Sequence, residues 1–114
     1  MNTGTLGEEI AAQYLRQKGW PLLYRNWRKG IYEIDLIAQE GEELVFVEVR
    51  TLSASVPWNA ETTITRRKQD RLRRSIATFF HHHPEYETCT ARIDVIAIRL
   101  TNPPEIYHLA DAFR

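Results

Sequence analysis

Apolar side chains recur at helical spacing in two segments of this 114-residue chain. The first helix is predicted over about residues 5–18, because Thr5-Leu6-Gly7-Glu8 fits a capping box and Gly19 fits a C′ stop. The second helix is predicted over about residues 64–81. Its apolar residues lie within one arc of the helical wheel and are Ile64, Leu72, Ile76, Phe79 and Phe80.

Alternating or continuous apolar runs predict strands in most of the remaining chain. The expected strands are residues 22–24, 31–39, 44–50, 91–100 and 106–109. The second and third form a hairpin through Glu40-Gly41-Glu42-Glu43, whereas residues 51–62 are expected to be a loop. The order α-β-β-β-α-β-β predicts an α/β fold in which helices pack on a mixed sheet. The length predicts a single domain over residues 1–114.

Charge is segregated along the chain, although the formal net charge is zero. Residues 14–29 carry five bases and no acid, residues 33–48 carry six acids and no base, and residues 65–74 carry six bases and one acid. An acidic centre between basic blocks suits a site that holds a divalent cation and receives a phosphodiester. The alternative is a solvated helix face and an acidic turn, which the charge pattern alone favours.

Three features predict a cytoplasmic protein without a membrane partner. No uninterrupted apolar run is longer than that of Leu44 to Val47, which is far too short to span a bilayer. Residues 1–4 lack the basic and apolar parts of a signal peptide. Cys89 is the only cysteine, which excludes an intrachain disulfide and a cysteine-based zinc site.

The hairpin carries the acids of greatest chemical interest. Strand alternation places Glu33 and Asp35 on one face and Ile34 and Leu36 on the other. In the next strand, Glu48 and Arg50 likewise share a face.

A tight turn at Gly41-Glu42, with glycine first as a type II′ turn prefers, would pair residues whose numbers sum to 83. Asp35 then lies opposite Glu48, with Cβ atoms roughly 4.5–5.5 Å apart. Two carboxylates so close repel each other, and a hard cation such as Mg²⁺ would reverse that interaction. A longer loop would shift the register and remove this pair.

Several short motifs together resemble the YraN-like family of uncharacterised bacterial proteins. That family belongs to the PD-(D/E)XK restriction-endonuclease-like superfamily and is similar to Holliday junction resolvases. The motifs are Gly7-Glu8, Tyr24-Arg25-Asn26, Glu33-Ile34-Asp35-Leu36-Ile37-Ala38, Val45-Phe46-Val47-Glu48-Val49, Arg67-Lys68-Gln69, Arg71-Leu72 and Arg92-Ile93-Asp94-Val95.

The resemblance implies a nuclease site and a DNA substrate. Asp35 stands at the metal-binding aspartate, Glu48 at the motif's acid and Glu8 at the first-helix glutamate. With the carbonyl of Val49, these residues are expected to hold Mg²⁺ or Mn²⁺. The similarity to resolvases implies branched DNA and, because a four-way junction has two scissile strands, a homodimer.

The chain departs from the family pattern where catalysis is concerned. Arg50 stands at the motif lysine, Tyr32 at a glycine and Leu52 at a basic residue. Arg50 can stabilise transition-state charge but cannot accept a proton. Lys68 falls about 40° from Leu72 on the helical wheel, on the apolar stripe. Lys68 is therefore the candidate substitute for the motif lysine, with a phosphate contact as its alternative role.

Two further glutamates have structural alternatives. Glu8 could be only the side chain of a capping box, although it borders the buried stripe of its helix. Glu33 is expected to form a cross-strand ion pair with Arg50 instead of binding metal. Asp94 is expected to form a structural pair with Arg92.

The remaining candidates concern nucleic-acid binding and the aromatic and histidine residues. The phosphate-binding candidates are Arg66, Arg67, Lys68 and Arg71. Trp58 is the candidate for stacking on a base, whereas Trp20 and Trp27 are expected in the core. Residues 81–83, all histidines, are expected to be a solvated helix end, because consecutive helical residues point 100° apart and cannot close on one ion.

The leading hypothesis is a divalent-metal-dependent endonuclease that acts on branched DNA. Asp35, Glu48, Arg50 and Lys68 would be its catalytic residues. The alternative, favoured by Arg50, is a nucleic-acid-binding module on the same fold without nuclease activity. A third hypothesis is an interaction protein that keeps only the fold.

Overall fold

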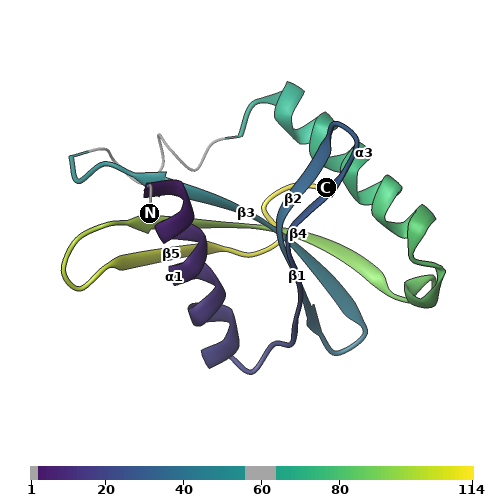
Figure 1. Ribbon diagram of the computed structural model, residues 1–114, viewed down its shortest axis with the longest axis horizontal. Coiled ribbons are helices and arrows are strands. Elements are labelled where there is room, and N and C mark those ends of the chain that lie inside the picture. The colour runs from purple at the N-terminus through teal and green to yellow at the C-terminus, as the bar shows by residue number, and fades with distance from the viewer. Residues whose placement is uncertain (1–2, 56–63) are drawn as a thin grey trace.

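The computed structural model describes residues 3–55 and 64–114. It is an α/β structure in which one mixed sheet lies between two helices, as the order of the sequence patterns predicts (Figure 1). The helices are α1 (Thr3–Gln17) and α3 (Arg66–His82). The strands are β1 (Leu22–Lys29), β2 (Tyr32–Glu40), β3 (Glu43–Leu52), β4 (Thr90–Arg99) and β5 (Glu105–Leu109), and a 3₁₀ turn covers Pro84–Tyr86.

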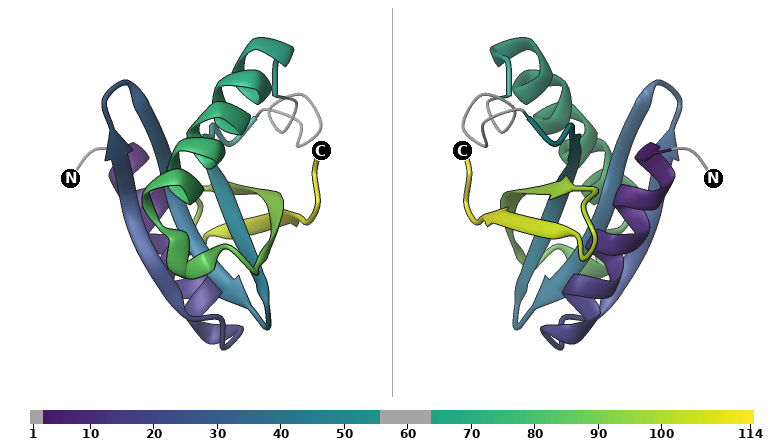
Figure 2. Two further views of the ribbon diagram at one scale, coloured as in Figure 1. Left: turned by 90° about the vertical axis from the view of Figure 1, so that its right-hand side faces the viewer. Right: turned by 90° about the vertical axis from the view of Figure 1, so that its left-hand side faces the viewer.

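The strands lie in the sheet in their order along the chain, β1-β2-β3-β4-β5. Neighbouring strands are antiparallel except β3 and β4, which are parallel, with α3 in the connection between them. A parallel pair needs such a crossover, whereas hairpins join antiparallel strands directly. The two helices lie on opposite faces of the sheet (Figure 2).

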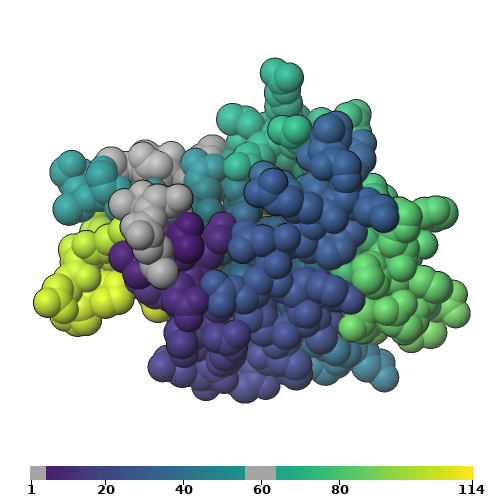
Figure 3. All heavy atoms as spheres, viewed as in Figure 1, coloured from purple at the N-terminus to yellow at the C-terminus, as the bar shows by residue number. Residues whose placement is uncertain are grey.

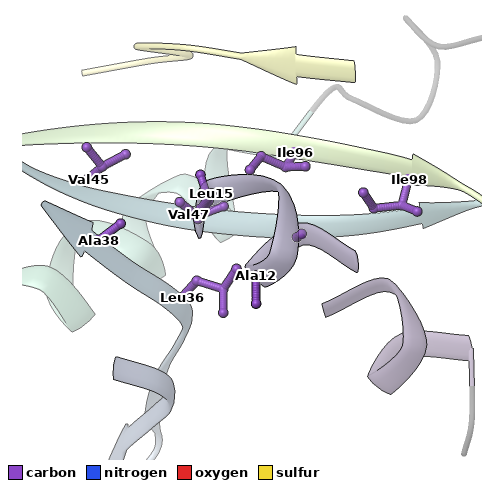
Figure 4. Packing of buried hydrophobic residues seen from close by; sticks show 9 residues of the cluster. Ala12, Leu15, Leu36, Ala38, Val45, Val47, Ile96 and Ile98 are labelled. Atoms are coloured by element: carbon purple, nitrogen blue, oxygen red, sulfur yellow. The ribbon is translucent and has the colours of Figure 1, made fainter. Parts of the chain in front are cut away.

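Helix α1 covers one face of the sheet with a stripe of small and branched residues. Ala11, Ala12 and Leu15 are fully buried against alternate residues of three strands (Figure 4). Those strand residues are Leu36, Ala38, Val45, Val47, Ile96 and Ile98. The stripe follows from the helical period of 3.6, and the strand residues follow from the period of two.

The ends of α1 agree only partly with those predicted from the sequence. The C′ glycine is confirmed: Gly19 has φ of 82°, and the Trp20 N–H donates to the Leu15 carbonyl at 3.2 Å. The capping box is wrong, because the helix already begins at Thr3. Thr5 is therefore inside the helix, and Glu8 is not the N3 residue of a cap.

Helix α3 covers the other face with an aromatic cluster. Its buried residues Leu72, Ile76 and Phe79 pack against Phe46 and Ile37 of the sheet. The helix begins after Thr65, whose side-chain hydroxyl accepts from the Lys68 N–H at 3.2 Å. Phe46, in β3, faces α3 whereas its neighbours in sequence face α1, so β3 is buried on both faces.

Strand β1 is longer than the three residues expected, running over Leu22–Lys29. Its second half is polar and mostly exposed, as an edge strand permits, which is why the apolar pattern did not reveal it. Trp27 is the buried exception, and Trp20 lies partly buried beside α1, so both tryptophans are at the core as expected. No helix in the described residues is long and apolar enough to cross a membrane.

Candidate functional site

The expected register of the β2–β3 hairpin is confirmed. Glu40 pairs with Glu43 and Leu36 with Val47, so paired residue numbers sum to 83, and Gly41 has φ of 62° as the first residue of the turn. The regular ladder ends at the Leu36–Val47 pair. Asp35 and Glu48 are the next residues on each strand, at the point where the strands stop pairing.

The alternation of β2 breaks at Asp35. Leu36 packs in the cluster under α1, but Ile34 packs in the cluster under α3, so the expectation that they share a face is wrong. The break coincides with an irregularity in the neighbouring strand. Arg25 pairs with Leu36 and Trp27 with Ile34, which places Asn26 opposite Asp35, and Asn26 has φ of 53°.

Asp35 is held by the backbone of β3. The Val49 N–H donates to Oδ2 of Asp35 at 2.8 Å. Burial, the Glu48 carboxylate and the Glu8 carboxylate raise the pKa of Asp35 to about 7, while the Val49 N–H and Lys68 act in the opposite direction. Asp35 therefore senses the charge of three other side chains that come from α1, β3 and α3.

Lys68 reaches inward from α3 to the same acids. Its Nζ atom lies 2.7 Å from Oε1 of Glu48, whose side chain is only 11% exposed. On the helical wheel Lys68 lies on the apolar stripe that faces the core. The structure accordingly places its ammonium at Glu48, at the edge of the core, while half of the side chain stays exposed.

Asp35, Glu48 and Lys68 line a groove with a volume of about 530 Å³ between β2, β3 and α3. Its other lining residues are Ile31, Tyr32, Glu33, Thr65, Arg67, Asp70, Arg71, Leu72, Arg74 and Ser75. The two acids and Lys68 thus share one cavity with three arginines of α3. Arg67, Arg71 and Arg74 are exposed and form no ion pair with a carboxylate in the described residues.

Other predicted site residues do not line the groove. Arg50 is half-buried further along β3, and Arg66, which lies outside the groove, is 3.7 Å from Asp70. The expected pair of Glu33 with Arg50 is wrong: Glu33 lies 3.2 Å from Arg28. The cause is the pairing of β1 with β2, which places Arg28 directly beside Glu33 beyond the end of the β2–β3 ladder.

Glu8 approaches the site through a close contact of α1 with β3. A Cβ atom on the buried Gly7 would overlap Oγ1 of Thr51, so only glycine lets the helix come this near. Glu8, the next residue, is close enough to raise the pKa of Asp35 but does not line the groove. In residues 3–55 and 64–114, no group of three or more His, Cys, Asp or Glu side chains is placed to hold a metal ion.

The prediction of a solvated helix end at residues 81–83 holds for only part of this segment. His81 and His82 are exposed, but His83 stacks on Phe79 with ring centroids 4.3 Å apart and lies 3.3 Å from Glu85. The chain turns back at His83, the C-cap residue, which explains its contact with the core. The stacking candidate Trp58 lies outside the described residues.

A second polar cluster lies on the α1 face, and only one of its pairs was predicted from the sequence. The expected pair of Asp94 and Arg92 is confirmed at 2.9 Å. The fully buried Asp94 also accepts from His108 at 2.7 Å and from the Asp111 N–H at 2.9 Å, and His108 in turn meets Tyr14 at 2.9 Å. Although burial opposes it, these hydrogen bonds and the Arg92 charge lower the pKa of Asp94. The cluster ties α1, β4 and β5 together.

Residues 7–98 match the family model described as "Uncharacterised protein family UPF0102". The chain belongs to the UPF0102 family. A UPF0102 protein of Treponema pallidum is 37% identical over 115 residues, which span 96% of this chain and 90% of that protein. A UPF0102 protein of Desulfitobacterium hafniense is 44% identical over 100 residues, 87% of this chain and 82% of that protein. One of Chloroflexus aurantiacus is 45% identical over 98 residues, 83% and 77% of the two chains.

The UPF0102 match confirms the resemblance to YraN-like proteins at the level of the family. The matched segment includes Glu8, Asp35, Glu48, Lys68 and Asp94, but it ends before β5 and therefore before His108. The sites in and around the groove thus lie within the part that defines the UPF0102 family.

The groove is also lined by residues that were not among the predicted site residues, including Ile31, Tyr32 and Arg74. Ile31 carried a signal: an isoleucine directly after Gly30 is unusual in a turn, where small polar residues dominate. Arg74 lies seven residues after Arg67, two helical turns along the same stripe, which the helical wheel could have shown.

Proposed function

We propose that this protein is a divalent-metal-dependent endonuclease of the restriction-endonuclease-like type that acts on DNA, and that the groove is its active site. The observation that carries the proposal is the convergence of Asp35, Glu48 and Lys68 in one cavity. A structural hairpin has no need of two adjoining acids beside its last pair. Acids in a cleft with a strongly shifted pKa and a lysine partner are typical of functional sites.

The donor set fits Mg²⁺ or Mn²⁺ better than Zn²⁺. Mg²⁺ is usually bound through one or two carboxylates together with water and substrate phosphates, so Asp35 and Glu48 suffice. Zinc sites need three or four protein ligands, and the described residues offer no such group. A divalent ion held by Asp35 and Glu48 would polarise a phosphodiester and supply a nucleophile near neutral pH.

The other residues of the groove have roles that follow from charge and position. Val49, through its N–H, fixes the orientation of the Asp35 carboxylate. Lys68 places an ammonium beside Glu48, where it can stabilise negative charge that develops on a phosphate. Arg67 and Arg71 line the same cavity and would bind neighbouring phosphates of the strand. In this proposal Lys68, and not Arg50, does the work of the motif lysine.

The test is cleavage of end-labelled DNA. Wild-type protein is incubated with linear, flapped and four-way DNA in Mg²⁺ or Mn²⁺, alongside Asp35→Asn, Lys68→Ala and Arg50→Lys. We expect cleavage that Asp35→Asn and Lys68→Ala abolish and that Arg50→Lys changes little. A marked increase in cleavage by Arg50→Lys would indicate that position 50, and not Lys68, has the catalytic role of the motif lysine.

The alternative is a nucleic-acid-binding module without catalysis, and one observation favours it. In the structure Lys68 itself supplies a positive charge to Glu48, so the acidic pair has a cation without a metal. DNA binding by wild type and Arg50→Lys, with no cleavage by either in both metals, would establish this alternative. The branched substrate and the homodimer are proposed from the similarity to resolvases. The comparison of linear, flapped and four-way DNA tests the substrate, and the molecular mass of the protein in solution, alone and bound to DNA, tests the homodimer.

A further inference from the structure

We infer that the groove takes an unpaired DNA strand, with one base packed against Ile31 and Tyr32 and its phosphates facing the arginines of α3. The inference rests on the proposed function, because it names the form of DNA that the same groove accepts. It is carried by the tip of the β1–β2 hairpin, which forms one wall of the groove. In Figure 3 the surface of this hairpin lies directly beside that of α3.

The tip of this hairpin is a two-residue turn. Lys29 pairs with Tyr32, so Gly30 and Ile31 form the turn, and Gly30 has φ of 60°. Turns of this kind take glycine first and small polar residues after it, because the second residue faces water. Ile31 is 71% exposed, the highest value among the exposed large hydrophobic residues that the structure describes.

The β2–β3 hairpin provides an internal comparison. It has the same two-residue turn, in which Gly41 has φ of 62° and the exposed Glu42 follows. The backbone geometry is therefore compatible with a charged second residue, and nothing in the fold requires an apolar one. The hairpin that carries the isoleucine is the one whose tip lines the groove. Ile31 also does not stand alone, because it lines the groove together with Tyr32, and an apolar pair at a groove is better explained by contact with a ligand.

Tyr32 completes the apolar wall. Its partly buried ring packs against the cluster under α3 and also lines the groove. The core thus holds the ring in place while part of it remains open to the cavity. An aromatic ring in this setting is a platform on which a base of any sequence can stack.

The opposite wall is positive. Arg67, Arg71 and Arg74 follow one stripe of α3, and Asp70, which also lines the groove, already pairs with Arg73 at 3.0 Å. A single strand presents phosphates on one side and base faces on the other, which matches a groove with a basic wall on α3 and an apolar hairpin tip, next to which Arg28 pairs with Glu33. In a duplex the base faces are stacked inside, so Ile31 and Tyr32 would have no partner. The two walls together favour an unpaired strand.

The test separates the contact with the base from the contact with the phosphates. Binding is measured by fluorescence anisotropy at low salt with EDTA, which prevents cleavage. The probes are a short oligothymidylate, an abasic strand with the same number of phosphates, and a duplex of the same length. Ile31→Asn removes the apolar tip, and Ile106→Asn is the matched control, because Ile106 is an exposed isoleucine that does not line the groove.

We expect wild type and Ile106→Asn to bind oligothymidylate about tenfold more tightly than the abasic strand, as the stacking of one base would give. Ile31→Asn should lose that preference and keep its affinity for the abasic strand. Tyr32→Leu, which preserves apolar packing but removes the aromatic ring, should lose part of the preference for oligothymidylate over the abasic strand. Equal binding of the base-bearing and abasic strands by wild type, or tighter binding of the duplex, would overturn the inference while DNA binding stands. Binding of none of the probes would overturn the proposed function as well.

Discussion

Lys68 and Glu48 meet across the groove, with Nζ of the lysine 2.7 Å from Oε1 of the glutamate. They belong to α3 and β3, twenty positions apart in the chain. The lysine side chain is 49% exposed, whereas that of Glu48 is 11% exposed, so a partly solvent-exposed cation pairs with a nearly buried acid. Lys68, and not Arg50, is therefore the cation that the structure places beside Glu48 and Asp35.

Replacing Lys68 by alanine should separate a chemical role from a structural one. We expect Lys68→Ala to abolish cleavage and to leave Mg²⁺ binding nearly intact, because the acids remain. Because the side chain of Glu48 is only 11% exposed, loss of its cation should also lower the free energy of unfolding, so stability is measured beside cleavage and metal binding. Arg66→Ala is the matched control, because Arg66 lies on the same turn of α3 but does not line the groove. Equal loss of cleavage in both variants would argue against a specific role for Lys68.

The raised pKa of Asp35 predicts how stability depends on pH. An acid whose pKa is about 7 in the folded state and near 3.8 when unfolded favours folding below pH 4, and that contribution is lost as pH rises towards 7. In EDTA, Asp35→Asn should therefore be more stable than wild type by about 2 kcal/mol at pH 8 and no more stable at pH 4. Urea unfolding at both pH values measures this difference. A difference that does not change with pH would show that Asp35 is not destabilised by its neighbours.

The same variant tests the metal site. A ligand that binds only the folded state raises the melting temperature, so Mg²⁺ or Mn²⁺ at saturation should stabilise wild type. Asp35→Asn should lose most of that shift, because it removes one of two ligands. Ca²⁺, which also binds oxygen donors, provides a check that the shift follows ligation and not turnover. A melting temperature indifferent to millimolar metal would contradict the metal site.

The arginines of α3 should govern salt-dependent binding of DNA. Arg67→Glu with Arg71→Glu should weaken binding to all sequences alike and reduce the slope of log affinity against log salt by about two, one for each lost phosphate contact. Arg16→Glu is the control, since Arg16 is an exposed residue of α1 on the opposite side of the sheet. The measurement is a titration at several salt concentrations. An equal effect of both changes would indicate a general effect of charge instead of a site.

Gly7 and Thr51 should behave as a coupled pair. Gly7→Ala places a methyl group against Oγ1 of Thr51, and the branched threonine has few rotamers with which to move away. We expect a loss of roughly 1–3 kcal/mol in the free energy of unfolding. Adding Thr51→Ala removes the clashing oxygen and should restore most of it, which a double-mutant cycle measures. If the losses of the two single variants in the free energy of unfolding simply added in the double variant, the two residues would not be coupled through this contact.

The buried Asp94 cluster should matter for stability and not for the groove. Asp94→Ala leaves Arg92 and His108 without their shared buried partner, and removing one member of such a network costs about 3–5 kcal/mol. Because the pKa of Asp94 is lowered, its contribution is present above about pH 4 and is lost as pH falls further. Thermal unfolding at pH 7 and pH 3 tests this, with wild type as reference. An Asp94→Ala protein that is as stable as wild type at pH 7 would refute it.

The amino-acid sequence by itself determined the element order, the hairpin register and the place of Lys68 on the apolar stripe of its helix. Each depends on local rules: apolar periods of 3.6 and two, a glycine at the turn, and the angle between residues of one helix. The tight turn at Gly41 fixed which residues of β2 and β3 adjoin, so the position of Asp35 and Glu48 directly beyond the last pair of the ladder followed from the length of that turn.

Only the tertiary structure decided what surrounds those two acids. The pairing of β1 with β2 took Glu33 to Arg28, and Ile34 and Leu36 face opposite sides of the sheet at the point where β1 is irregular at Asn26. The packing of α3 on the sheet brought Lys68 to Glu48 and left Arg50 outside the groove. These outcomes depend on contacts between segments far apart in the chain, and no local period or spacing carries that information.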